Sequence, residues 1–453
     1  MIFPVRLAAT AHRQMLHSLN LRHRRRVEMT LRKKQLDYKW VILILCFLME
    51  FICLGFCSSN PGLYTKAITE ALGIKRSVYA LSSSIRYAAQ VLVALNFGTL
   101  VSKFGTKKMV CVGMLSLTAS VAIRAVAANV FHIYLGSAFW GIGIVFAGGT
   151  MAGTIVRRWF DKDVGRYTGI VMSANGIGGA IAAQIISPLI NNGEVFGYRK
   201  AYLLSAVLSL IISIVIMIFM REHYSDASAA QTDGGKKKPR GAIWAGLNYD
   251  QIKRKPYFYA TAVLVFLTGI SLQSVGNVTL VYMGDLKMDD GFIATTATVF
   301  SLVLTFTKVF VGAMYDKKGL QTTLTICQVA TLLCFLLFAT MRNSLLGQIL
   351  AMVAKVLEAI ALPMETVMIT LIVGNLFGTA AFDKVLGVLY AMNSLGLCLG
   401  SPVGDLFYDT FGSYKPCFWF FTVLMFLVII GYRFVIKAAY KDKETFLAET
   451  ANA

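Results

Sequence analysis

Seven ionisable side chains lie inside long apolar stretches of this 453-residue sequence, where a charge is costly unless it has a use. They are Glu50, Arg86, Arg124, Lys308, Lys355, Glu358 and Glu365. Charges in such surroundings mark solute or proton pathways by default, so these residues are the first candidates for chemistry. Four cations and three carboxylates allow two kinds of chemistry, which are the binding of a charged solute and the carrying of a proton.

Helical spacing predicts partners for some of these charges. Lys355 and Glu358 are three residues apart and are expected to pair on one helix. Glu365 lies on the same helical face without an obvious partner, so it is the favoured candidate for proton coupling. Glu50 and Glu358 are the other candidates for that role. Arg86 and Glu50 lie in neighbouring stretches and are expected to pair if both stretches border one cavity.

The composition indicates which elements hold these residues. Hydrophobic residues make up 57% of the chain and charged residues only 15%, below the roughly 25% of a soluble domain. The mean hydropathy is +0.65, which excludes a single soluble fold and a disordered chain. A spanning helix needs about 20 apolar residues. Twelve stretches qualify, namely 40–60, 77–100, 107–128, 131–156, 165–190, 200–221, 257–283, 292–315, 320–341, 345–373, 383–407 and 416–437.

The sequence therefore predicts an all-α membrane protein with twelve transmembrane helices. Arg124 lies near the outer end of the third span and is expected to snorkel to the interface. The expected parts are a basic N-terminal tail (1–39), a first six-helix half (40–221), a linker (222–256), a second six-helix half (257–437) and a C-terminal tail (438–453).

The basic residues predict the orientation of the chain. The formal net charge is +21, and most of the 44 Lys and Arg residues lie in the two tails, the linker and the loops on the same side. Lys and Arg collect on cytoplasmic loops of membrane proteins. Both termini and the linker are thus expected in the cytoplasm, with the protein in the plasma membrane and the lipid bilayer as its surroundings.

Two loops of identical spacing indicate an internal repeat. The first contains Gly98, Lys103, Gly105, Lys107 and Lys108, and the second contains Gly312, Asp316, Lys317 and Gly319. A second echo places Asn175 and Asn393 six residues after Gly169 and Gly387. The halves are therefore expected to superpose with both asparagines beside a central cavity, as in transporters built from repeats.

These loops resemble the loop motif of the major facilitator superfamily, in which glycines permit a tight turn and charged residues contact a helix end. The resemblance implies the major facilitator fold, with two pseudo-symmetric six-helix halves and gating by these loops. The acidic residue of the motif is kept as Asp316 in the second half and replaced by Ser102 in the first. The run Arg157-Arg158-Trp159-Phe160 resembles the oxalate/formate antiporter group and its monocarboxylate-transporter relatives.

The resemblance also implies substrate-binding residues. Lys308 occupies the place of an arginine that binds the substrate carboxylate in those families, and its alternative is a lysine that snorkels to the inner surface. Asn393 stands where some members have a lysine. With Arg86 and Asn175, these residues form the expected substrate site. The expected function is secondary active transport of a small organic anion, a monocarboxylate or a dicarboxylate, by alternating access as antiport or proton-coupled symport.

One alternative function stays open, which is proton-coupled export of drug-like or cationic solutes. Several other classes find no support. The chain has no GxxxxGK[ST] loop and no HExxH pair, so neither an enzyme, a cofactor nor a metal site is predicted. The chain is too apolar to offer nucleic acid a wet basic face. The protein is expected to function as a monomer.

Overall fold

The structure is a computed structural model that describes residues 38–58, 61–74, 76–160, 162–190, 196–222 and 246–451. Within these ranges every regular element is a helix. The predicted tail up to residue 37 and the middle of the predicted linker, 223–245, lie outside the described residues.

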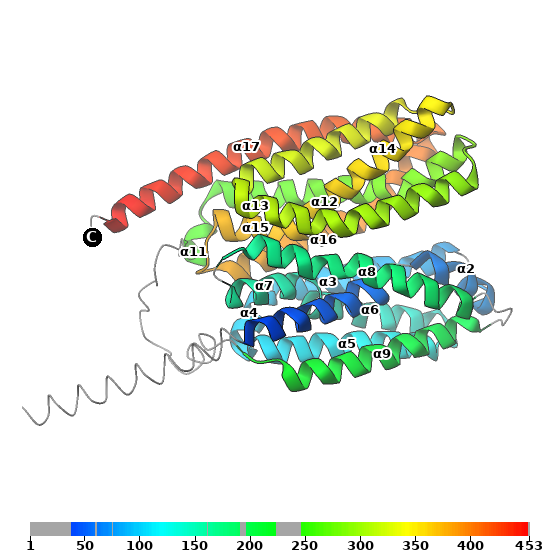
Figure 1. The fold of residues 1–453 in the computed structure, drawn as a ribbon, viewed down its shortest axis with the longest axis horizontal. Helices are drawn as coiled ribbons and strands as arrows, with labels where there is room; N and C mark the ends of the chain where they lie inside the picture. Colours follow the sequence, from blue (N-terminus) through cyan, green and yellow to red (C-terminus); the bar gives the residue numbers. More distant parts are fainter. Residues whose placement is uncertain are drawn as a thin grey trace, which may run out of the picture.

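The helices form two bundles that lie side by side (Figure 1). The first half begins with the span Tyr38–Phe56, whose last turn is the π-helix η1 (Phe51–Phe56). Its other helices are α2 (Pro61–Leu72), α3 (Arg76–Leu95), α4 (Phe97–Phe104), α5 (Thr106–Ala125), α6 (Val130–Ala147), α7 (Gly149–Trp159), α8 (Val164–Ile190) and α9 (Gly197–Phe219).

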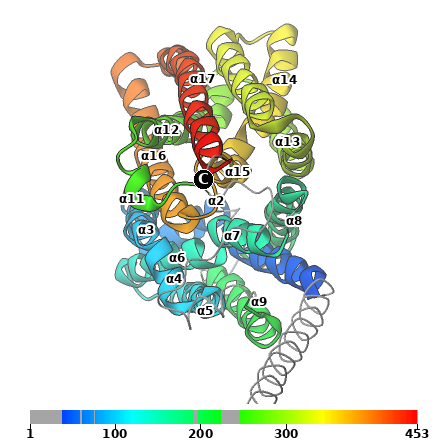
Figure 2. The ribbon, with the colours of Figure 1, turned by 90° about the vertical axis from the view of Figure 1, so that its left-hand side faces the viewer.

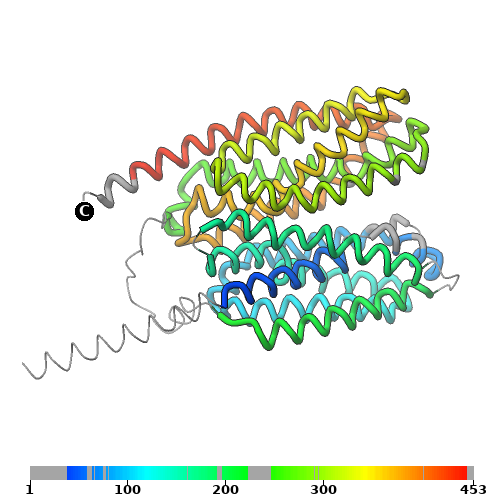
Figure 3. Tube along the Cα trace, viewed as in Figure 1, coloured from blue at the N-terminus to red at the C-terminus, as the bar shows by residue number. Residues whose placement is uncertain are grey.

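The second half lies above the first in Figure 1, and Figure 3 traces the chain through both halves. It contains α11 (Tyr249–Ile252), α12 (Pro256–Asp285), α13 (Asp290–Thr340), α14 (Leu345–Ala361), η2 (Leu362–Met364), α15 (Val367–Leu376), α16 (Phe382–Phe411) and α17 (Lys415–Ala451). Figure 2 turns the molecule by 90° and shows the two groups of helices end-on.

Ten described helices are long and apolar enough to cross a membrane, and the bent pair Leu81–Leu95 with Phe97–Phe104 makes eleven. The 51-residue helix α13 is not one straight span, because Gly319 has a φ of 78° in its middle. Few residues other than glycine adopt that conformation, so the chain turns back there. With α13 divided at Gly319, the described helices account for all twelve predicted spans.

Breaks inside spans have local causes. Asn96 separates α3 from α4, which are bent by 57°. Pro363 lies in η2 between α14 and α15, where its missing N–H interrupts the helical hydrogen bonds. Glu365 follows this interruption directly, so the break determines where its carboxylate lies.

The two halves touch at the end of the molecule that carries both glycine-containing loops, which we call the loop-motif end. There α8 packs along α13, and α3 and α4 pack along α16. A Cβ atom on Gly98 would lie 2.5 Å from the backbone N of Lys384, and one on Gly387 would lie 2.5 Å from the carbonyl O of Ala94. Glycine at these positions therefore allows the helix backbones of opposite halves to approach closely.

Candidate functional site

A cavity of about 240 Å³ lies between the two halves. The first half lines it with Leu54, Ser58, Arg86, Tyr87, Gln90, Ile144, Gly149, Thr150 and Asn175. The second half lines it with Gln273, Glu365, Thr366, Ile369, Thr370, Leu386, Tyr390, Asn393 and Leu397. The wall thus combines apolar and aromatic surface with a few polar groups, which is typical of a small-molecule site.

Arg86 on α3 supplies the positive charge of this wall. Its Nη1 donates a long hydrogen bond to Ser58 Oγ at 3.5 Å, and its guanidinium lies 4.3 Å from the ring centre of Tyr87. The Nε atom is buried without a hydrogen-bond partner. The predicted pairing with Glu50 is wrong, because no carboxylate among the described residues forms an ion pair with Arg86. Arg86 is therefore a cation of the cavity wall without a carboxylate partner among the described residues.

Glu365 supplies the negative charge of the wall, from the break between α14 and α15. Its Oε1 is buried without a hydrogen-bond partner, and no ion pair joins it to a cation of the described chain. The side chain of its neighbour Thr366 also keeps a buried, unpartnered oxygen. The cavity thus holds one cation and one carboxylate that do not neutralise each other by direct contact.

The two repeat-related asparagines both line the cavity, Asn175 from α8 and Asn393 from α16. The Oδ1 atom of Asn393 is buried without a partner. Gly269 on α12 leaves room for that amide, since a Cβ there would lie 2.8 Å from the Oδ1 atom. In this conformation the amide oxygen is thus packed against α12.

Lys308 lies apart from this cavity wall. Its side chain is 2% exposed, and its Nζ donates to the carbonyl O of Met172 at 3.3 Å. The alternative of a snorkelling lysine is therefore wrong, because the amine stays between α8 and α13. The carboxylate that acts on it electrostatically is Glu50 of the first span.

Glu50 is fully buried, and neither of its oxygens has a hydrogen-bond partner. A Cβ on Gly149 would lie 3.8 Å from Glu50 Oε1 and 3.1 Å from the side chain of Met172, so Glu50 and Lys308 share one neighbourhood. Glu50 directly precedes the π-helical turn η1, and such turns are frequent at functional sites. The two residues therefore lie within electrostatic reach of each other across the interface between halves, and no ion pair joins them in this conformation.

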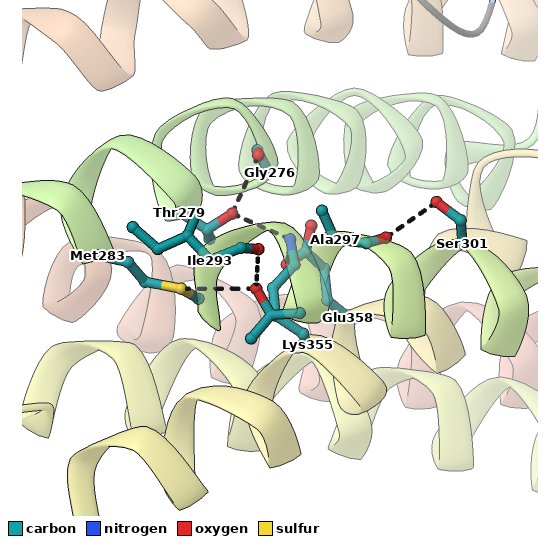
Figure 4. Close-up of polar contacts among 9 residues, drawn as sticks. Gly276, Thr279, Met283, Ile293, Ala297, Ser301, Lys355 and Glu358 are labelled. Carbon is teal, nitrogen blue, oxygen red and sulfur yellow. Dashed lines mark hydrogen bonds and ion pairs between the residues drawn. The ribbon is translucent and has the colours of Figure 1, made fainter. Parts of the chain in front are cut away.

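Lys355 and Glu358 pair as predicted, with Nζ 2.8 Å from Oε2 (Figure 4). Lys355 also donates to Thr279 Oγ1 on α12 at 3.1 Å and lies 4.5 Å from the ring centre of Phe300 on α13. Both charges are buried inside the second half and are absent from the cavity wall. Glu358 is thus the partner of Lys355, whereas Glu365 lines the cavity.

Arg124 does not snorkel as expected, since it is only 3% exposed. Its Nη2 donates to Ser137 Oγ at 2.7 Å, and its guanidinium lies 4.2 Å from the ring centre of Trp140. Gly136 makes room for the side chain, because a Cβ there would lie 2.9 Å from Arg124 Cγ. The neighbouring helix α6 therefore holds the charge inside the first half.

The loop motifs close the loop-motif end in two different ways. Asp316 accepts hydrogen bonds from the backbone N–H groups of Gly165 and Arg166, at 3.0 Å and 2.7 Å. Ser102, its counterpart, donates only to Thr99 of its own helix. Near the loop motif of the first half, Arg158 instead forms an ion pair with Asp383 in the first turn of α16.

Several wall residues were missed by sequence reasoning. Gln90 donates to Ser394 Oγ across the two halves at 2.7 Å, and Tyr87, Gln273 and Tyr390 also line the cavity. Gln90 lies one helical turn after Arg86, so its place on the same helical face could have been used to predict that it lines the cavity. The uncharged aromatic and amide residues carry no such signal, because the same types are common in helix packing.

Comparison with known proteins identifies the family of this chain. The family model of the Major Facilitator Superfamily matches residues 40–354 and 261–451, and the chain belongs to that family. It is therefore a multi-pass membrane protein of a transporter family.

Three curated relatives show the range of this similarity. The chain is 21% identical to the sialic acid transporter NanX of Escherichia coli over 60% of this chain and 65% of NanX, which is less than two thirds of that protein. It is 22% identical to the multi-drug resistance efflux pump PmrA of Streptococcus pneumoniae over 63% of this chain and 67% of PmrA. It is 21% identical to human monocarboxylate transporter 12 over 91% of this chain and 84% of that protein.

Solved structures agree on the fold. The fucose:proton symporter FucP of E. coli superposes with a TM-score of 0.67 at 15% identity, covering 88% of this chain and 99% of FucP. The proton:xylose symporter XylE superposes with a TM-score of 0.68 at 12% identity, covering 88% of this chain and 96% of XylE. The fold is thus the major facilitator fold, as the sequence predicts.

Proposed function

We propose that this protein is a secondary active transporter of a small organic anion, and that its preferred substrate carries a single carboxylate. The observation that carries the proposal is the uncompensated guanidinium of Arg86 in the cavity wall. A guanidinium offers a planar fork of donors that matches a carboxylate. The polar wall residues Asn393, Gln90 and Gln273 then bind the rest of the solute.

Charge balance favours proton-coupled symport over anion exchange. When Arg86 is charged and Glu365 is ionised, the charges of these two residues in the cavity wall sum to zero. If one monocarboxylate binds to Arg86 and one proton binds to Glu365, the net charge of the cavity does not change. A dicarboxylate, or a monocarboxylate without the proton, leaves an extra negative charge in a low-dielectric space, which is costly.

The names of two relatives support an acidic substrate, because one carries sialic acid and another monocarboxylates. The proposed orientation follows the positive-inside rule and places the loop-motif end in the cytoplasm of a plasma-membrane protein. Contacts between halves at that end fit a conformation whose cavity is closed toward the cytoplasm. The proposed functional unit is a monomer.

Transport by purified protein in liposomes tests the proposal. The substrates are pyruvate, lactate, oxalate and N-acetylneuraminate, each measured with an imposed pH gradient and in counterflow. We expect uptake of at least one monocarboxylate, loss of that uptake in Arg86→Met, and partial uptake in Arg86→Lys. Absence of carboxylate uptake by wild-type protein in both formats contradicts the proposal.

The second candidate function is export of cationic solutes, and Glu365 is the observation that favours it. Its unpartnered carboxylate oxygen in the cavity is suited to an organic cation. The relative named as a multi-drug efflux pump agrees with this candidate. Efflux of ethidium from the same liposomes separates the two, because the export candidate requires Glu365 and tolerates Arg86→Met.

A further inference from the structure

Two guanidinium groups share one indole ring in the first half. The guanidinium of Arg124 lies 4.2 Å from the ring centre of Trp140, and that of Arg86 lies 5.3 Å from it. Trp140 and Arg124 are 6% and 3% exposed. Arg86 alone of the three reaches the cavity wall. A cation against an indole ring is attracted by about 0.5–2 kcal/mol, so the ring holds both groups in place.

Helix α6 is built to admit both arginines. Gly136 lies four residues before Trp140 and leaves space for the Arg124 side chain, while Gly141 follows Trp140 directly. A Cβ on Gly141 would overlap the backbone O of Arg86. These two glycines thus allow α5 and α3 to approach α6 closely, so that Arg124 and Arg86 both reach the Trp140 ring.

Neither guanidinium has a carboxylate partner within the described part of the chain. The Nε atoms of Arg86 and Arg124 and the indole Nε1 of Trp140 are all buried without a hydrogen-bond partner. Lys355, a buried cation of the second half, differs from both arginines because it contacts Glu358 directly (Figure 4). Two positive charges in a low-dielectric region therefore remain without an anion.

We propose that Trp140 and Arg124 are positioning residues for Arg86. The Trp140 ring fixes the Arg86 guanidinium at the cavity wall, and the positive charge of Arg124 strengthens anion binding there. The inference rests on the proposed function for the role of Arg86. Arg124 itself touches no solute, because it lies behind the ring. Its charge acts through space, so its effect grows with the charge of the solute.

Coulomb's law sets the size of the effect. At about 10 Å and an effective dielectric of about 20, one unit charge changes the affinity for a monoanion by roughly tenfold. The same charge changes the affinity for a dianion by roughly a hundredfold and leaves a neutral solute unaffected. A purely structural role for Arg124 predicts equal losses for all three.

The experiment is isothermal titration calorimetry of the full-length, detergent-solubilised protein with pyruvamide, pyruvate and malonate. These probes are similar in size and carry charges of 0, −1 and −2. Arg124→Met removes the charge and keeps an unbranched side chain, while Arg124→Lys restores the charge. Trp140→Leu removes the ring and Trp140→Phe keeps an aromatic face. Arg199→Met is the matched control, because Arg199 lies on Phe196 at 4.3 Å and donates to Ala127 O, and no cation–π contact with Trp140 is found for it in the described part of the chain.

We expect Arg124→Met to weaken pyruvate binding about tenfold and malonate binding about a hundredfold, with pyruvamide unchanged. Arg124→Lys and Trp140→Phe are expected to retain most of the affinity, and Arg199→Met all of it. Equal losses for the three probes, or no loss for the anions in Arg124→Met and Trp140→Leu, overturn the inference. If Arg124→Met does not fold, an unaltered charge dependence in Trp140→Leu has the same consequence.

The same measurements separate this inference from the proposed function. Charge-dependent binding without any carboxylate uptake in liposomes contradicts the transport proposal and leaves the inference standing. Carboxylate uptake that Arg124→Met and Trp140→Leu do not change contradicts the inference alone. Wild-type protein that binds neither pyruvate nor malonate contradicts the inference directly, whatever the uptake assay gives.

Discussion

Asp316 of the second half accepts a hydrogen bond from the backbone N–H of Arg166 at 2.7 Å, at the first turn of α8 in the other half. The second carboxylate oxygen accepts from Gly165 at 3.0 Å. A negative charge is stabilised at a helix N-terminus by the free N–H groups and the helix dipole. The contact joins the two halves at the loop-motif end, so it stabilises the conformation in which that end is closed.

We therefore predict that Asp316→Ala opens the loop-motif end. Hydrogen bonds to a charged group contribute about 1.5–3 kcal/mol each, so losing two shifts the equilibrium between conformations by more than tenfold. Double electron–electron resonance between spin labels at positions 103 and 318 measures the opening. Ser102→Ala is the control and is expected to leave the distances unchanged. Identical distance distributions in Asp316→Ala and wild-type protein contradict the prediction.

The first half closes through an ion pair instead. Arg158 contacts Asp383 in the first turn of α16 and also donates to Thr106. We predict that Asp383→Asn and Arg158→Gln each open the loop-motif end and that their effects are not additive. A double-mutant cycle on the same spin-label distances is expected to give a coupling of about 0.5–3 kcal/mol. Strictly additive effects are the result that contradicts this pairing.

Contacts local in sequence were predictable and contacts between halves were not. Apolar run lengths predicted the spans, because a helix satisfies its backbone hydrogen bonds within itself. Lys355 and Glu358 were predicted to pair because they lie three residues apart on one helix. The neighbourhood shared by Glu50 and Lys308 depends on how the halves pack, which no local pattern encodes. The same holds for Arg124, whose position is decided by small residues on another helix.

The proximity of Glu50 and Lys308 leads to a prediction about stability, on the hypothesis that both are charged and act as a buried pair. Removing one partner of a buried charge pair leaves an uncompensated charge, at a cost of about 3–5 kcal/mol, whereas removing both is close to neutral. We expect Glu50→Gln and Lys308→Met each to lower the melting temperature of the solubilised protein. Glu50→Gln/Lys308→Met is expected to recover most of that loss. A double variant less stable than both single variants contradicts a charge pair.

Lys308 also leads to a transport prediction. Lys308→Ala is expected to abolish uptake in liposomes, and Lys308→Arg to retain part of it, because the positive charge opposite Glu50 is kept. The melting temperature of each variant is the control for folding. Wild-type uptake by correctly folded Lys308→Ala protein shows that this lysine has no part in transport.

Lys355 and Glu358 are expected to behave differently, because they lie outside the cavity wall. Glu358→Gln is predicted to lower the melting temperature by leaving Lys355 uncompensated. Lys355→Met/Glu358→Met is predicted to restore stability and to retain pH-gradient-driven uptake. Loss of gradient-driven uptake in this folded double variant assigns the proton to the pair and contradicts its structural role.

Glu365 is predicted to carry the coupled proton. It lies at the break between α14 and α15, it lines the cavity, and its Oε1 has no hydrogen-bond partner. A carboxylate in such a cavity is able to take up a proton on one side of the membrane and release it on the other as access alternates.

We expect Glu365→Gln to lose accumulation driven by a pH gradient and to keep counterflow exchange, because the anion still binds Arg86 while the proton has no site. Glu50→Gln is the comparison, since Glu50 lies outside the cavity wall beside Lys308. Gradient-driven accumulation that persists in Glu50→Gln/Glu365→Gln excludes both carboxylates as proton carriers and leaves anion exchange as the mechanism.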